Sequence, residues 1–147
     1  MSPPDPRILT FIGEHHILNL AVSLNNQPYC ATCYYVYMPE TNRFIVTSDP
    51  DTRHIRDMVE TNNYSVAGTI ALETRLIGKI RGIQFTGLMK EIPENDLKKV
   101  RSAYLKRFPV ARLTTLHLWA IEPDFIKMTD NRLGFGTKLI WKEPLPG

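Results

Sequence analysis

Hydrophobic and other β-forming residues fill three stretches in the first third of the chain, which is typical of β-strands. The stretches are Ile17–Leu24, Tyr29–Met38 and Phe44–Ser48. Two short segments rich in Asn, Pro and Thr, Asn25–Pro28 and Pro39–Asn42, separate them and favour turns. Because such short turns join neighbouring antiparallel strands, the pattern predicts a three-stranded meander.

A helical period of apolar residues appears at three other places. Arg7–His15 is predicted to form a short amphipathic helix, and a second helix begins near Thr52 and stops at Asn62. The third lies between Pro93 and Pro109. Its basic residues are interpreted as the solvated face of an amphipathic helix.

The remaining apolar segments predict four more strands, at Tyr64–Leu72, Ile80–Ile92, Leu118–Met128 and Lys138–Trp141. Six or seven short strands with a few helices between them favour a mainly β, α+β fold, an antiparallel β-barrel with flanking helices. We expect one domain over residues 1–147, in which residues 1–6 are disordered.

Composition narrows the class of protein. The chain has 147 residues, of which 43% are hydrophobic and 22% charged, as in an ordinary globular domain. No apolar run approaches the ~20 residues that span a bilayer, and the first residues do not resemble a secretory signal, so a soluble, cytoplasmic protein is expected. The net charge is only +3, and no basic stripe with interleaved aromatic residues indicates a nucleic-acid partner.

Cys30 and Cys33 form a Cys-x-x-Cys, a spacing known from redox and metal sites. Here it falls within a strand, where residues three apart point to opposite faces of the sheet. A disulfide or a shared metal is therefore not expected, and the four histidines show no metal-binding spacing. A thiol beside a ligand stays open as the alternative to simple packing.

The segment from Phe44 to Met58 runs from a strand end into a helix start. Its hydroxyl and cationic side chains are those of Thr47, Ser48, Thr52, Arg53 and His54. The unpaired N–H groups and the dipole of a helix start favour an anion, and these side chains add donors and charge. The segment therefore suits a phosphate group, although an ordinary capped surface helix is the alternative interpretation.

Together, the strand Phe44–Ser48, the helix start Thr52–His54 and the strand opening Asn62–Ala67 resemble the FMN-binding split-barrel family typified by pyridoxamine 5′-phosphate oxidase. The resemblance covers nearly the whole chain after residue 6, and its ending Asp130–Trp141 is similar to that of a bacterial branch of these proteins. It implies a split β-barrel, an FMN cofactor, and a homodimer with the cofactor in the groove between the subunits.

The resemblance also implies which residues hold the cofactor. The phosphate and neighbouring atoms would contact the strand end and helix start, at Thr47, Ser48, Thr52, Arg53 and His54. Thr32 and Cys33 fall on the strand that lies along the flavin in the family, and Arg81 or Gln84 on its long strand. Lys138 and Trp141 would reach the site from the partner subunit, with a surface cation and core packing as the alternatives.

Two departures from the family pattern affect the expected function. His54 replaces a lysine, so its positive charge depends on pH, and the Arg-containing substrate-binding ending is missing near Trp141. Pyridoxamine phosphate oxidase activity itself is therefore not expected. We expect a flavin-dependent oxidoreductase of a small molecule, with no catalytic base identified.

Two other classes of function stay open. One is a non-enzymatic protein that binds or senses a flavin or haem, for which His15, His16 and His117 are the candidate haem ligands. The other is a structural dimer without a cofactor.

Overall fold

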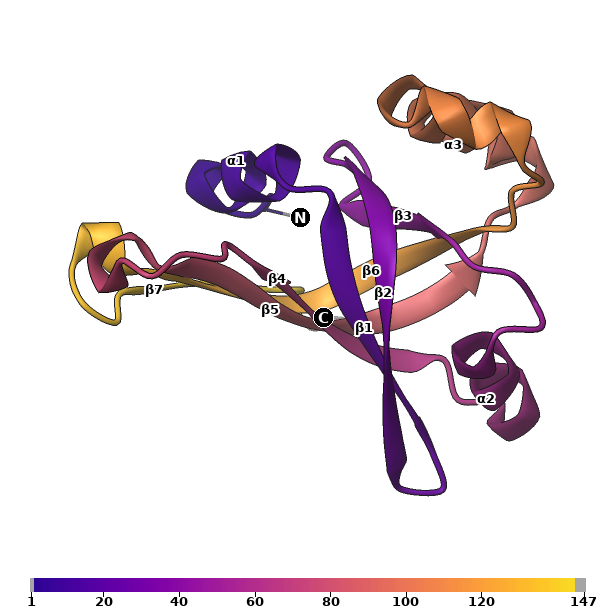
Figure 1. The fold of residues 1–147 in the computed structure, drawn as a ribbon, viewed down its shortest axis with the longest axis horizontal. Helices are drawn as coiled ribbons and strands as arrows, with labels where there is room; N and C mark the ends of the chain where they lie inside the picture. Colours follow the sequence, from indigo (N-terminus) through magenta and orange to yellow (C-terminus); the bar gives the residue numbers. More distant parts are fainter. Residues whose placement is uncertain (1, 145–147) are drawn as a thin grey trace.

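The computed structural model describes residues 2–144 and confirms the predicted α+β fold with seven antiparallel strands in one sheet (Figure 1). The strands are β1 (Ile17–Leu24), β2 (Gln27–Met38), β3 (Arg43–Thr47), β4 (Ser65–Ala71), β5 (Arg81–Glu91), β6 (Leu118–Asp130) and β7 (Lys138–Lys142). The helices are α1 (Pro6–Glu14), α2 (Arg53–Thr61) and α3 (Glu94–Arg107), with short 3-10 turns η1 (Ile77–Lys79), η2 (Pro109–Leu113) and η3 (Asn131–Leu133). The predicted meander is confirmed as β1–β2–β3.

The strand order is β3-β2-β1-β4-β5-β6-β7, and an additional pairing of β3 with β6 closes the barrel. The two halves of the long strand β6 have different partners along one edge. Its first residues pair with β3, from Leu118 opposite Thr47 to Ile121 opposite Phe44. Its second half pairs with β7 instead, so the barrel splits along β6.

A β-bulge bends the β5–β6 pair where the two halves of β6 meet. Thr86 lies opposite Phe125, but the next residue, Gly87, lies opposite Pro123, so the register shifts between them. A Cβ built on Gly87 would lie 2.4 Å from the carbonyl oxygen of Glu122. Only glycine allows the two backbones to approach this closely, so the sequence places it where the barrel opens.

The core fills the barrel and extends under α1 and α2. α1 buries Ile8, Phe11 and Ile12, which lie on one face at helical spacing. The Asp5 carboxylate caps this helix by accepting a hydrogen bond from the backbone N–H of Arg7. The Tyr35 hydroxyl donates to the carbonyl of Ile12 at 2.6 Å and ties the helix to β2.

α3 packs on a second, smaller apolar cluster beside the barrel. Val100 and Tyr104 of the helix are buried against Met38, Ile45 and Ala120 of the sheet. Among residues 2–144, no helix has the length and apolar character needed to cross a membrane.

Candidate functional site

The end of β3 and the start of α2 meet at Ser48, which is held from three sides. Its backbone N–H donates to the carbonyl of His117 at 2.9 Å, and the Trp119 indole N–H donates to its carbonyl at 3.2 Å. Its hydroxyl lies 2.8 Å from Nε2 of His54. Ser48 is therefore a rigid part of the barrel wall rather than part of a loose loop.

A buried group of polar side chains surrounds this hydroxyl. His54 is 8% exposed and Cys33 is 5% exposed. Burial lowers the pKa of His54, and the Asp57 carboxylate opposes that change by raising it. Burial raises the pKa of the Cys33 thiol, against a hydrogen bond with the Ser48 side chain that lowers it. Both groups are therefore held toward their neutral forms.

Arg53 sits at the edge of this group, half exposed. Its guanidinium lies 4.2 Å from the centre of the Tyr29 ring, and its Nε is 3.6 Å from Oδ2 of Asp57. Asp57 is buried, and its Oδ2 has no hydrogen-bond partner among the described residues. Tyr29 and Asp57 thus fix the direction in which Arg53 presents its charge.

The N-terminus of α2 adds backbone donors to the same place. Thr52 is the N-cap residue, but its side chain makes no capping hydrogen bond, because its hydroxyl donates to the Asp49 carbonyl at 2.7 Å. Thr47 is half-buried, and its hydroxyl oxygen accepts from the His117 backbone N–H. The first N–H groups of α2 are thus left free of side-chain caps, an arrangement suited to an anion.

The outer face of the sheet forms a second part of the site. The strand register aligns Thr32, Asn19, Thr69 and Gln84 in one row across four strands. Thr32 donates to Asn19 Oδ1 at 3.2 Å, and Asn19 Nδ2 donates to Thr69 at 3.5 Å. Small residues in the neighbouring rows leave a hollow of about 350 Å³ over this face, lined in part by Gln84 and Phe125.

The two cysteines lie on opposite faces of the sheet, as predicted. Cys30 is exposed and lines the hollow on the outer face, whereas Cys33 is buried on the barrel side. Both cysteines are free. Within residues 2–144, no group of three or more potential metal ligands is found.

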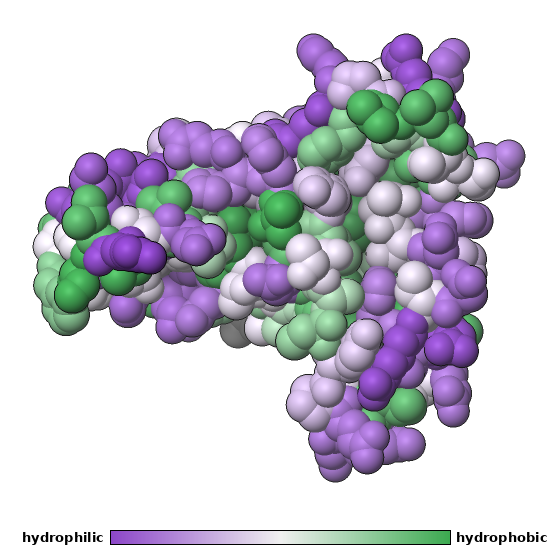
Figure 2. Space-filling view, viewed as in Figure 1, coloured by the Kyte–Doolittle hydropathy of each residue, from purple (hydrophilic) through white to green (hydrophobic). Residues whose placement is uncertain are grey.

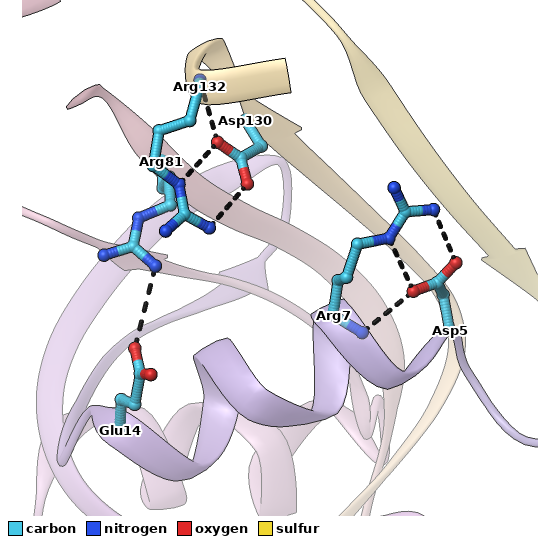
Figure 3. A network of polar contacts seen from close by, with 6 residues as sticks. All are labelled: Asp5, Arg7, Glu14, Arg81, Asp130 and Arg132. Carbon is cyan, nitrogen blue, oxygen red and sulfur yellow. Dashed lines mark hydrogen bonds and ion pairs between the residues drawn. The ribbon is translucent and has the colours of Figure 1, made fainter. Parts of the chain in front are cut away.

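The structure does not bring every predicted site residue to this region. Arg81 belongs to a separate polar network beside α1, which Figure 3 shows as the pairs Asp5–Arg7, Glu14–Arg81 and Asp130–Arg132. Trp141 is buried in the barrel core, and its indole N–H donates to the Ser2 carbonyl at 2.9 Å. Lys138 is exposed and donates to Thr129 at 3.1 Å.

Four residues near the site were not singled out from the sequence. Asp57 was detectable, because it lies one helical turn after Arg53, where an ion pair with that residue is favourable. Asn19 and Thr69 are ordinary polar positions of alternating strands, and only the register brings them together. Tyr29 had no sequence signal, because its contact with Arg53 joins β2 to α2.

Comparison with known proteins finds relatives across almost the whole chain. A UPF0306 protein of Klebsiella pneumoniae subsp. pneumoniae is 38% identical over 132 residues, which cover 90% of this chain and 88% of the relative. A UPF0306 protein of Yersinia pseudotuberculosis is 37% identical over 149 residues, covering 99% of this chain and 100% of the relative. No protein-family model matches the chain.

Solved structures share the fold at low sequence identity. A heme-binding protein of Mycobacterium smegmatis has a TM-score of 0.71 at 12% identity, over 86% of this chain and 52% of that one. A FAD-binding protein of Mesorhizobium loti has a TM-score of 0.68 at 15% identity, over 83% and 89%. A putative pyridoxamine 5′-phosphate oxidase of Listeria innocua has a TM-score of 0.60 at 13% identity, over 83% and 92%. The shared fold is the split barrel of these proteins.

Proposed function

The chain belongs to the UPF0306 protein family, and from the geometry of the β3–α2 junction we propose that it binds FMN as a homodimer and acts as a flavin-dependent oxidoreductase on a small molecule. The observation that carries the proposal is the buried Ser48–His54 contact at 2.8 Å beside the uncapped start of α2. Neighbours of this fold include a FAD-binding protein and a putative pyridoxamine 5′-phosphate oxidase.

The donor set at the junction fits a phosphate group. The N–H groups of α2, the Ser48 hydroxyl and the Arg53 guanidinium can all donate to phosphate oxygens. His54 adds a donor that becomes cationic when protonated. The buried Asp57 carboxylate would repel an anion, but it is ion-paired with Arg53, and it raises the His54 pKa and so favours the protonated form of that residue.

The outer face of the sheet suits the planar ring. Thr32, Asn19, Thr69 and Gln84 offer a row of hydrogen-bonding groups on a flat surface with small neighbours. In the proposed dimer a second copy covers this surface, excludes water from the ring and brings Lys138 to the site. Cys33 would lie behind the ring on the barrel side.

FMN supplies the redox chemistry when it is bound. The residues of this chain position it: Arg53 and His54 hold the phosphate, and the strand row orients the ring edge by hydrogen bonds. The buried thiol of Cys33 is held neutral, so it presents a polarisable, uncharged wall.

Titration of the purified apo-protein with FMN, followed by quenching of flavin fluorescence, tests the proposal. Saturable quenching at one FMN per subunit, with a dimeric mass in solution, is the expected result. A Soret band in the protein as purified would instead support haem binding, in line with the haem-binding structural neighbour. A colourless protein that does not bind FMN would contradict both and leave a structural dimer.

A further inference from the structure

The outer face of α3 carries a concentration of positive charge that the flavin proposal does not use. Lys98 and Arg101 lie one helical turn apart on α3, and Lys106 lies about two turns after Lys98. Arg112 of η2 lies beside them because the chain turns back after Pro109. With Ser102 and Leu105, they line one hollow of about 590 Å³, here called the α3 basic hollow. Figure 2 shows hydrophilic side chains projecting from this corner of the molecule.

No acidic side chain lines the α3 basic hollow. None of its four cations forms an ion pair or a side-chain hydrogen bond within residues 2–144. Asp96, near the start of the same helix, is engaged elsewhere by Arg43 at 2.8 Å. The cations therefore repel one another with no ion-pair partner among residues 2–144, and an anion in the hollow would relieve that repulsion.

We propose that the α3 basic hollow binds a small molecule carrying two or more phosphate groups. Two guanidinium groups offer bidentate donors to phosphate oxygens, and two ammonium groups add point charges. The Ser102 hydroxyl is a further donor, and Leu105, which is 6% exposed, forms an apolar floor. The volume lies within the roughly 300–1,000 Å³ typical of small-ligand pockets.

The shape and composition separate this ligand from larger polyanions. A nucleic-acid strand needs an extended basic track with aromatic residues for base stacking, whereas these cations surround one local hollow that no aromatic side chain lines. A membrane surface is met by exposed apolar side chains. Val110 and Leu113 of η2 are exposed beside Arg112, but neither lines the hollow, whose apolar residue is the buried Leu105. Four cations in one hollow also exceed what a single phosphate can neutralise.

Isothermal titration calorimetry with inorganic tripolyphosphate tests the proposal, with orthophosphate as the single-phosphate comparison. The test variant is Arg101→Gln with Arg112→Gln. The control variant, Arg75→Gln with Lys79→Gln, removes the same charge from exposed positions outside the hollow. We expect one tripolyphosphate per chain, binding weakened roughly tenfold or more in the test variant, and unchanged binding in the control.

Three results would overturn the proposal. Equal weakening in both variants would mean that only net charge matters, and the absence of saturable tripolyphosphate binding would mean that no site exists. The third result is a parent protein that sediments with phosphatidylglycerol vesicles but does not bind tripolyphosphate, together with a test variant that no longer sediments with them. That result would identify a membrane-binding surface instead. Thermal unfolding of both variants checks that the fold is intact. His54→Gln should leave tripolyphosphate binding unchanged, and this control separates the hollow from the proposed flavin site.

Discussion

At the residue scale, the proposed phosphate site depends on side chains with unequal burial. His54 and Ser48 are held inside the barrel wall, whereas Arg53 is half exposed and is oriented by Tyr29 and Asp57. Rigid donors lose little conformational entropy on binding a ligand, while an exposed arginine contributes chiefly through its charge. Arg53 and His54 are therefore expected to respond differently to substitution and to pH.

Replacement of Arg53 by alanine is predicted to weaken FMN binding by about 1.5–3 kcal/mol, the range for a hydrogen bond to a charged group. Fluorescence titration measures the change. Arg56→Ala is the matched control, because Arg56 is exposed on the same helix and should leave the affinity unchanged. Equal FMN affinity of the Arg53 variant and the parent would show that Arg53 does not contribute to FMN binding.

The pH dependence of the protein should change sign between folding and binding at His54. Because burial lowers its pKa below the ordinary value of 6.5, the unfolded state binds the proton better. The contribution of neutral His54 to the free energy of unfolding should therefore be complete above pH 6.5 and should be lost as the pH drops through the lowered pKa. Denaturant titrations of the parent and His54→Gln measure this, and the variant should lose that part of the dependence.

FMN affinity should respond in the opposite direction, because protonated His54 attracts the phosphate. Lowering the pH from about 8 toward the lowered pKa of His54 should strengthen FMN binding in the parent more than in His54→Gln. Riboflavin, which lacks the phosphate, is the control ligand. The same pH profile for FMN and riboflavin would speak against a phosphate contact at His54.

At the scale of elements, the bulge in the β5–β6 pair lies where the barrel opens. β6 pairs with β3 in its first half and with β7 in its second half, and its pairing with β5 slips by one residue between these halves, beside Gly87. A bulge of this kind bends a strand locally, and Gln84 in the outer row of β5 lines the hollow on that face.

A Gly87→Ala substitution is predicted to destabilise the protein by about 1–3 kcal/mol, because its Cβ would overlap backbone atoms that cannot move away. Gly82→Ala on the same strand is the control, since a Cβ there would make only an ordinary contact, 3.4 Å from the Ile70 carbonyl. Urea unfolding measures both. Similar free energies of unfolding for the two variants would show that the close approach is not limiting.

At the scale of the whole molecule, one face of the sheet is packed and the other is open. Alternate residues of β1, β4 and β5 fill the barrel, while small and polar residues of the same strands lie outside. This partly apolar outer face with its hollow is the surface that the proposed dimer would bury.

Ala67→Glu, which puts a charge at the centre of this face, is predicted to convert the proposed dimer into a folded monomer with weaker FMN binding. Light scattering coupled to gel filtration gives the mass, and circular dichroism checks the fold. Val59→Glu adds the same charge at an exposed position of α2 and should leave the dimer intact. A dimer that survives Ala67→Glu would place the interface elsewhere.

The sequence by itself determined the elements and their order, because the period of apolar residues and the turn residues act over a few positions. The helix predicted at Arg7–His15 is observed at Pro6–Glu14, and the strand predicted at Ile17–Leu24 has those bounds. The group at the β3–α2 junction was also accessible, since Ser48, Arg53 and His54 are close along the chain.

Only the tertiary structure decided which distant residues meet. Arg81 lies with Glu14 rather than with His54, and Trp141 fills the core, because the split along β6 carries the second half of the sheet away from β3. The α3 basic hollow likewise depends on the turn that brings Arg112 back beside the helix. A local pattern shows that a strand has two faces, but strand register and chain reversal determine what each face contacts.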